Sequence, residues 1–378
     1  MKFKINRSKL SNVLSVVAGA AADNSPTEIL KNVLMVSHSD KITLTATNLS
    51  EWISVDCEAE IIDGGSVAVN AKFISELVKS MNDHEFIVLE EKNNKVMVRS
   101  ENGKSKYNVP NYATDDFPKY NESDIDESKM ISINGNDFYS FVNSVKFAAS
   151  DEQFRLILNS IFIRNCGSYI DCVSTDGHRL GYNKLVGDFG ANDGINGIVH
   201  INTVPNIGRI CSGVSTDVKI LWNEKYLLIR TDGGRELYAR LIEGVYPNFE
   251  HVVPKNQAIS IITNTNKMFE IVKRVGLAAS EVNHQVTISI KDGVAILSSS
   301  NNRAGSDGSE ELPIDFNGED IEFSFNGKYL VELLRNVKTE KVRITTDKDA
   351  GSATMFYPVA VNDEKSDDWK GLLMPLRI

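Results

Sequence analysis

The chain has 378 residues, of which 42% are hydrophobic and 24% charged, so it is long enough for two or three globular domains. The first residues lack the apolar run of a secretory signal, and no stretch approaches the ~18 apolar residues of a membrane span, which predicts a cytoplasmic protein. The formal net charge of −10, taken alone, argues against a nucleic-acid partner, because a DNA-binding protein usually carries excess Lys and Arg.

The repeat that organises the chain starts with a strand and a helix. Four landmarks recur in the same order with a period of about 128 residues, much longer than a solenoid unit. The first landmark is a short strand of alternating polarity, beginning at Phe3, Ile131 and Ile259. It leads into a segment whose apolar residues are three and four apart, which predicts an amphipathic helix.

A hairpin of two strands is the second landmark, and it begins at Val33, Ile161 and Val286. Ser-Asp, Gly-Ser and Asp-Gly pairs supply its turns. The second strands end at equivalent positions, which are Thr47, Thr175 and Ser300.

The third landmark is a strand followed by a second helix. Asn70, Asn202 and Asn326 stand at the junction, where an Asn side chain can cap a helix. Pro205 lies near the start of one of these helices, where its missing N–H costs nothing.

A closing pair of strands completes the first two copies, which then end alike at Pro118 and Pro247. Each copy is therefore a β-rich unit with two helices, and the fold class is α+β with three tandem copies of one domain. A polar acidic segment at 121–128 and the region of Pro254 to Asn256 mark the boundaries. The predicted domains are 1–127, 128–255 and 256–378.

The predicted helices carry a charge opposite to that of the whole chain. They span 8–19, 71–82, 136–146, 203–213, 266–276 and 327–338, and hold eleven basic and four acidic residues. That balance is +7, which leaves −17 for the rest of the −10 total. These helices are either ordinary solvated faces, on which Lys is common, or, if they share one surface, a basic lining for phosphates.

The cysteines give no sign of a metal centre. None of the four belongs to a CxxC pair or to a cluster of closely spaced Cys and His residues. We therefore expect buried free thiols, no metal and no cofactor. The four are Cys57, Cys166, Cys172 and Cys211.

Four segments carry a resemblance to a known family. They are STDGHRL at 174–180, RLILNSIF at 155–162, EGVYPNFEHVVP at 243–254 and LLMPLRI at 372–378. In these motifs, in length and in repeat number, the whole chain resembles the β subunit of bacterial DNA polymerase III. The resemblance implies a ring of two head-to-tail protomers around duplex DNA, with helices lining the hole. It further implies a non-enzymatic processivity factor that tethers the replicative polymerase, the clamp loader and repair proteins.

The resemblance also implies where partners dock. Short peptides would bind between domains two and three, where Gly177 allows close backbone approach and Met374 adapts to varied partners. The implied pocket residues are Leu158, Thr175, Gly177, His178, Arg179, Leu180, Pro247, Val252, Ser352, Leu372, Leu373, Met374, Pro375, Leu376 and Arg377.

Two further sets of residues follow from the same resemblance. The implied DNA-facing cations are Lys72, Lys79, Lys146, Arg209, Lys273, Lys328 and Lys338. At the dimer seam, an edge strand with Lys106, Tyr107 and Val109 would pair with the edge of domain three, and Leu277 and Ala278 would pack across it.

Two alternatives belong to other classes. Asp171, Asp176 and His178 could form a metal-assisted hydrolase site, but the two carboxylates are five residues apart on a predicted strand and so face opposite sides. The chain also lacks the GxxxxGK, GxSxG and HExxH motifs. The second alternative is a repeat protein that never meets DNA; it would be monomeric and would show no salt-sensitive retention on DNA.

Overall fold

The computed structural model describes residues 1–378 except 124, 191–193, 215, 256, 292, 317, 349–350, 361–367 and 377–378. The chain forms two compact units. The first contains residues 1–139 and 202–241, and the second contains 140–201 and 242–378. The middle repeat is thus divided between the units, with its first and last strands in one and its central hairpin in the other.

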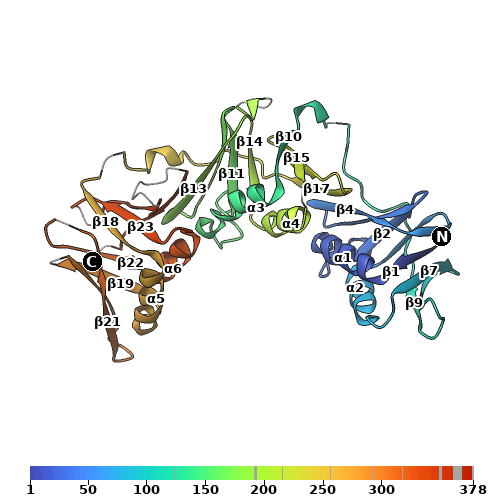
Figure 1. The fold of residues 1–378 in the computed structure, drawn as a ribbon, viewed down its shortest axis with the longest axis horizontal. Coiled ribbons are helices and arrows are strands. Elements are labelled where there is room, and N and C mark those ends of the chain that lie inside the picture. The colour runs from blue at the N-terminus through green and yellow to red at the C-terminus, as the bar shows by residue number, and fades with distance from the viewer. Residues whose placement is uncertain are drawn as a thin grey trace. The chain divides into compact units, whose positions relative to one another are not determined.

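The first unit contains two antiparallel sheets (Figure 1). The five-stranded sheet has the order β5 (Glu60–Asp63), β1 (Lys2–Asn6), β7 (Phe86–Lys92), β8 (Lys95–Ser100) and β9 (Lys106–Pro110). The eight-stranded sheet has the order β10 (Ile131–Asn134), β15 (Asp217–Trp222), β16 (Tyr226–Arg230), β17 (Arg235–Arg240), β4 (Glu51–Glu58), β3 (Lys41–Thr47), β2 (Asn32–Ser37) and β6 (Ser66–Asn70).

The second unit repeats this plan. Its eight-stranded sheet has the order β14 (Asn196–His200), β11 (Ser160–Asn165), β12 (Tyr169–Thr175), β13 (Arg179–Val186), β25 (Trp369–Leu373), β24 (Thr354–Val359), β23 (Lys341–Thr346) and β18 (Ile259–Asn264). Its four-stranded sheet has the order β21 (Ser306–Pro313), β20 (Val294–Asn301), β19 (Gln285–Lys291) and β22 (Ile321–Asn326).

Each eight-stranded sheet runs across a boundary between repeats. In the first unit β17 of the middle repeat pairs with β4 of the first repeat, and Tyr238 lies opposite Trp52. In the second unit β13 of the middle repeat pairs with β25 of the third, and Leu180 lies opposite Leu372. Backbone hydrogen bonding is therefore continuous from repeat to repeat within each unit.

All six predicted helices form. They are α1 (Arg7–Val17), α2 (Ala71–Ser80), α3 (Gly135–Asn143), α4 (Thr203–Cys211), α5 (Thr265–Val275) and α6 (Gly327–Asn336). Each starts within one residue of its predicted start but ends one to three residues early. The predicted ends ran into tighter 3₁₀ turns at η1 (Ala18–Ala20), η4 (Lys146–Ala148) and η7 (Gly276–Ala278), which commonly follow helix ends.

Asn side chains fix most of the helix starts. Asn70 Oδ1 accepts from Phe73 N, and Asn326 Oδ1 accepts from Lys328 N and Tyr329 N, as predicted. Asn202 occupies the cap position of α4 but makes no capping hydrogen bond. The first helix of each repeat also has an Asn cap, which was not predicted from the sequence, and the caps are Asn6, Asn134 and Asn264.

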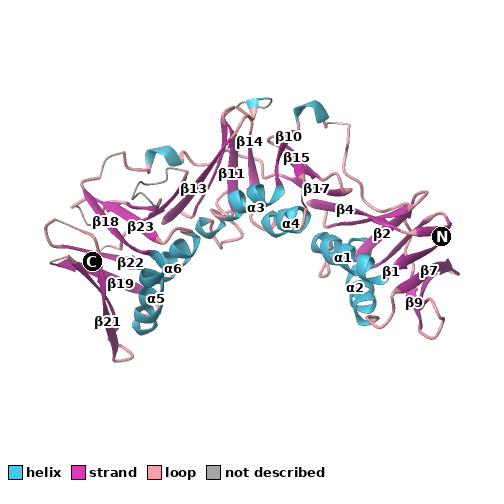
Figure 2. Ribbon diagram, in the orientation of Figure 1, coloured by secondary structure: helices cyan, strands magenta, loops and turns pink. Residues whose placement is uncertain are grey.

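The helices lie against the sheets (Figure 2), and apolar side chains fill the space between them. In the third repeat, α5 buries Met268 and Val272, while α6 buries Leu330 and Leu333. These side chains share one core with Phe325 of β22. Their polar faces are left for solvent or a ligand, as expected for amphipathic helices.

The cysteines are free, as expected, and three of the four are buried. Burial raises the pKa of the Cys57 thiol to about 11 and that of Cys211 to about 12. Within the described residues, no group of three or more His, Cys, Asp or Glu side chains is arranged to hold a metal ion. Among the helices that the structure describes, none is long and apolar enough to cross a membrane.

Candidate peptide-binding and DNA-facing sites

The turn between β12 and β13 is held by its own side chains. Asp176 Oδ1 accepts from His178 N at 2.8 Å and from Arg179 N at 3.0 Å. Thr175 Oγ1 donates to Arg179 O at 2.7 Å and accepts from Gly177 N at 3.1 Å. Gly177 has φ +93°, a conformation that favours glycine. The turn is therefore rigid, and it exposes Gly177 and His178.

The C-terminal tail runs beside this turn. Met374 N donates to His178 O at 2.8 Å, directly after the last pair of the β13–β25 ladder. Leu376 N then donates to Ser324 O of β22 at 2.7 Å. Main-chain bonds thus hold the tail against the turn at Met374 and against β22 at Leu376. Arg377, which was expected at the same site, lies outside the described residues.

An apolar cluster lies under the turn and the tail. Leu180 and Leu372 are buried in it together with Tyr246, Phe249 and Met355. Thr175 N donates to the Tyr246 hydroxyl at 3.1 Å, and burial raises the pKa of this phenol. Tyr246 and Phe249 were not expected as site residues, although they stand beside Pro247 in the family-like segment 243–254.

The remaining expected pocket residues fall into two groups. Pro247, Val252 and Met374 are exposed at the surface, and Leu158, Ser352, Pro375 and Leu376 are half-buried. Leu373 was expected to line the pocket, but its side chain is buried in the core of the third repeat. Successive side chains of a strand point to opposite faces, so Leu372 and Leu373 cannot both face the same cluster.

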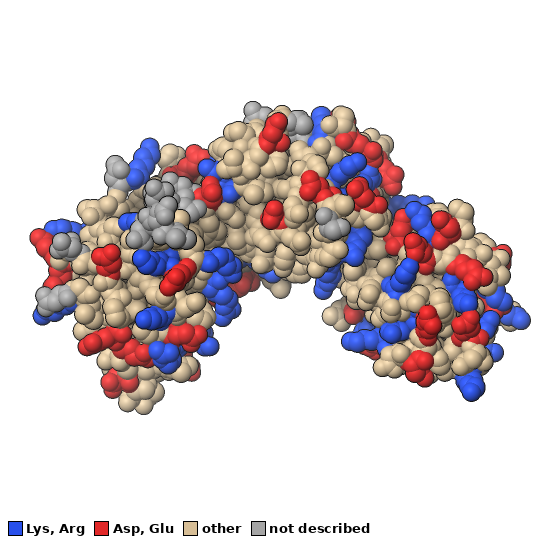
Figure 3. Space-filling model, in the orientation of Figure 1, with Lys and Arg blue, Asp and Glu red and all other residues tan. Residues whose placement is uncertain are grey.

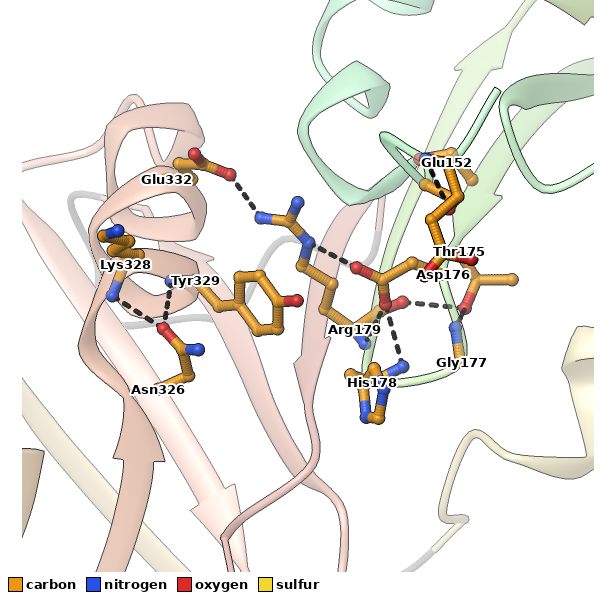
Figure 4. A network of polar contacts seen from close by, with 12 residues as sticks. Glu152, Thr175, Asp176, Gly177, His178, Arg179, Asn326, Lys328, Tyr329 and Glu332 are labelled. Atoms are coloured by element: carbon orange, nitrogen blue, oxygen red, sulfur yellow. Dashed lines mark hydrogen bonds and ion pairs between the residues drawn. The ribbon is translucent and has the colours of Figure 1, made fainter. Parts of the chain in front are cut away.

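Arg179 connects the turn to helix α6 (Figure 4). Its Nε donates to Asp176 Oδ2 at 2.9 Å, and its Nη1 forms an ion pair with Glu332. Its guanidinium lies 4.2 Å from the centre of the Tyr329 ring. Only 3% of the Arg179 side chain is exposed, so its charge is paired with Asp176 and Glu332 inside the protein.

The expected DNA-facing cations are largely on helix surfaces. Lys72 and Lys79 are exposed on α2, Arg209 on α4, Lys273 on α5 and Lys328 on α6. Lys338 is exposed just beyond α6, and the half-buried Lys146 lies on η4, not on α3 as predicted. Figure 3 shows Lys and Arg side chains along the edges where Figure 1 draws α2 in one unit and α6 in the other.

Each unit ends in an unpaired edge strand where a dimer contact was expected. β9 is one edge of the five-stranded sheet, with Lys106 and Tyr107 exposed, while the Val109 side chain is buried. β21 is one edge of the four-stranded sheet. Leu277, on η7, is 85% exposed, and Ala278 is half-buried.

The acidic residues of the hydrolase alternative are already engaged. Asp171 is buried and forms an ion pair with Arg164 at 2.7 Å. Asp176 holds the turn and Arg179, as described above. Neither carboxylate faces the other across a common cavity that the structure describes, so their geometry gives no support to metal-assisted hydrolysis.

Three family models match successive parts of the chain. The N-terminal, central and C-terminal domain models of the DNA polymerase III β subunit match residues 1–121, 132–248 and 250–377. The chain belongs to the DNA polymerase III β subunit family. Curated relatives named beta sliding clamp include those of Caulobacter vibrioides, 26% identical, and Pseudomonas aeruginosa, 24% identical, each aligned over 100% of both chains.

Solved structures agree with the fold. The Pseudomonas aeruginosa DNA polymerase III β subunit superposes with a TM-score of 0.92 at 23% identity, covering 100% of both chains. As a member of the DNA polymerase III β subunit family, this chain is a sliding-clamp subunit. It is a processivity factor and not a catalyst, which is the class that the sequence predicted.

Proposed function

We propose that two copies of this chain close into a ring around duplex DNA and tether the replicative polymerase, the clamp loader and repair proteins to it. The match of three clamp domains over almost the whole chain is the observation that supports this proposal most strongly. The work would be done in the cytoplasm, with the domains at 1–127, 128–255 and 256–378.

The ring is supported by the two edge strands. An unpaired edge is a template for another strand. Each protomer has one such strand in its first repeat, β9, and one in its third, β21. β9 presents the cation Lys106, whereas β21 presents the exposed acids Asp307 and Glu311. Opposite charges on the two edges favour head-to-tail pairing over pairing of like edges. Leu277 and Ala278 would pack beside that seam.

DNA contact is proposed for the cations on the helix surfaces. Lys72, Lys79, Lys273 and Lys328 are exposed, and none of them forms an ion pair with a carboxylate in the described part of the chain. A cation without a protein partner can exchange its counterion for a phosphate, which makes binding depend on salt. The proposed set also includes Lys146, Arg209 and Lys338.

Peptides are proposed to bind over the apolar cluster between the turn and the tail. Pro247, Val252 and Met374 offer exposed apolar surface there, and Leu180 and Leu372 form its base. Burying one Leu or Phe of a peptide contributes roughly 1.5–3 kcal/mol, before ordering costs. Single peptides should therefore bind weakly, on the order of micromolar, and the two sites of a ring would add avidity.

The test is topological. Protein is loaded on nicked circular DNA, the unbound fraction is removed, and the circle is then cut. An encircling ring stays on the circle and slides off the free ends after linearisation. Retention on linear DNA with open ends would show that the protein grips DNA without encircling it. Light scattering should give twice the mass of one chain.

A further inference from the structure

A groove of about 290 Å³ lies between helices α5 and α6. Val272 of α5 and Val331 of α6 supply apolar lining. Cations stand around it, namely Lys273 from α5 and Lys328 and Arg335 from α6, all of them exposed. This combination suits the sugar–phosphate backbone of DNA, because deoxyribose can lie on apolar side chains while the phosphates meet the cations.

One residue of the groove opposes that use. Glu332 also lines it, between Lys328 and Arg335, and is the only acidic residue of α6. A carboxylate close to a phosphate repels it by about 1 kcal/mol or more at a protein surface. Uncompensated, Glu332 would cancel much of the attraction of one neighbouring cation.

Arg179 compensates this charge from another repeat. Its Nη1 is paired with Glu332, although β13 and α6 are far apart in the sequence. The guanidinium is buried, rests on the Tyr329 ring and also binds Asp176. A buried guanidinium with these partners has little freedom to turn outward and bind a peptide.

We propose that Arg179 is a positioning residue that neutralises Glu332, so that the α5–α6 groove accepts the DNA backbone. This inference rests on the proposed DNA-encircling function. The same side chain also fixes the turn whose carbonyl group at His178 receives Met374 N. One residue thereby supports two separate activities, DNA contact through its charge and peptide binding through its position.

The experiment separates charge from position by combining Arg179→Met with Glu332→Gln. Full-length protein is titrated against a short fluorescent duplex over about 50–200 mM salt, and against a clamp-binding peptide that begins with Gln. Arg179→Met exposes the Glu332 charge and should weaken duplex binding about 3-fold at the lower salt. The slope of log affinity against log salt should become shallower by about one.

Rescue is the decisive result. Arg179→Met/Glu332→Gln should recover wild-type duplex affinity, because it leaves no unpaired carboxylate at position 332. Its peptide affinity should stay reduced, because the turn still lacks the bond from Arg179 to Asp176. Glu332→Gln alone should bind duplex no more weakly than wild type. If the double variant stays as weak on duplex as Arg179→Met, or if Arg179→Met binds duplex like wild type, the charge-masking role is wrong.

Arg230→Met is the matched control. Arg230 also bridges two carboxylates, Glu127 and Glu236, but on β16 of the first unit. Its loss should leave duplex and peptide affinity unchanged, and an effect as large as that of Arg179→Met would overturn the proposal. If wild-type protein shows no salt-dependent duplex binding at all, the groove does not take the DNA backbone and the charge-masking role is wrong. The separate test on nicked circular DNA then decides whether the proposed ring encircles DNA.

Discussion

The two junctions between repeats share the same turn geometry but differ in the side chains that cover the sheet beside the turn. At the first junction, where β4 pairs with β17, Asn48 Oδ1 accepts from Ser50 N and Glu51 N. At the second, where β13 pairs with β25, Asp176 Oδ1 accepts from His178 N and Arg179 N. The residue between has a positive φ in both, +71° at Leu49 and +93° at Gly177.

Both turns also send a buried charged side chain to the second helix of the following repeat. Glu51 Oε2 accepts from Asn206 Nδ2 of α4 at 2.6 Å, and Arg179 pairs with Glu332 of α6. The charges are reversed, but the connection is the same. The repeat is thus preserved in its polar contacts, which explains how copies with weak sequence similarity can share one geometry.

The junctions differ in what covers the sheet next to the turn. At the first, Trp52 packs edge-on against Tyr120 and Tyr238, which stack on each other with ring centres 4.2 Å apart. Trp52 Nε1 also donates to Pro118 O at 3.0 Å. At the second, the positions of Trp52 and Tyr238 are taken by Leu180 and Leu372. The first junction is thus covered by rings from the paired strands themselves, whereas at the second the paired leucines pack in an apolar cluster with Tyr246 and Phe249.

The largest expected effect comes from opening the first junction. Trp52→Ala removes a nearly fully buried aromatic side chain and should lower the free energy of unfolding by about 3–5 kcal/mol, measured by urea denaturation. Trp52→Phe keeps a ring, loses the bond to Pro118 O, and should cost less. Peptide affinity should not change in either folded variant. A loss of peptide binding in Trp52→Phe would mean that the first junction also serves partners.

The next effect concerns the second junction, where β13 pairs with β25. Removing Met374 to Ile378 deletes the main-chain bond from Met374 N to His178 O and the exposed Met374 side chain. Affinity for a Gln-initiated clamp-binding peptide should fall at least about 10-fold, which is ~1.4 kcal/mol. Isothermal titration calorimetry measures it, with Trp52→Phe as the folded control. Equal affinity in the truncated and full-length chains would rule out the tail as part of the site.

A smaller loss of stability is expected from removing the cap of helix α6. Asn326→Ala removes the cap of α6, the helix that Arg179 contacts, and should destabilise the protein by about 1 kcal/mol. Asn326→Asp retains an acceptor at the cap and should preserve stability. Thermal melts of both variants measure this. If Asp is as harmful as Ala, the role of Asn326 is not capping.

Helices and repeats were predictable because they depend on local pattern. Apolar spacing located all six helices, and Asn correctly marked the capped starts of α2 and α6. Leu373 was misplaced because the sequence does not reveal which face of β25 packs on the Leu180 cluster and which on the core of the third repeat. The burial of Arg179 was missed for a related reason. A polar turn such as DGHRL looks exposed, and nothing local indicates that Glu332, in another repeat, will cover its cation.

The buried charge at the first junction gives the smallest effect. Glu51 is 6% exposed, and one of its oxygens, Oε1, has no hydrogen-bond partner among the described residues. Burial is the main cause that raises the pKa of its carboxyl above the usual value, and hydrogen bonds from Thr203 and Asn206 partly oppose this. A raised pKa means that the folded state holds the proton more tightly than the unfolded chain. Glu51 therefore favours folding at low pH and loses that contribution as pH rises through its folded-state pKa.

Glu51→Gln tests this by keeping the shape and removing the titration. Near neutral pH the variant should melt about 1–2 °C higher than wild type, because Gln needs no buried charge. The gap should narrow as pH falls below the folded-state pKa of Glu51, where wild type becomes neutral as well. Melts from acid to neutral pH provide the comparison. A gap that stays constant over that range would mean that Glu51 does not titrate there and that its contact with Asn206 is made equally well by either side chain.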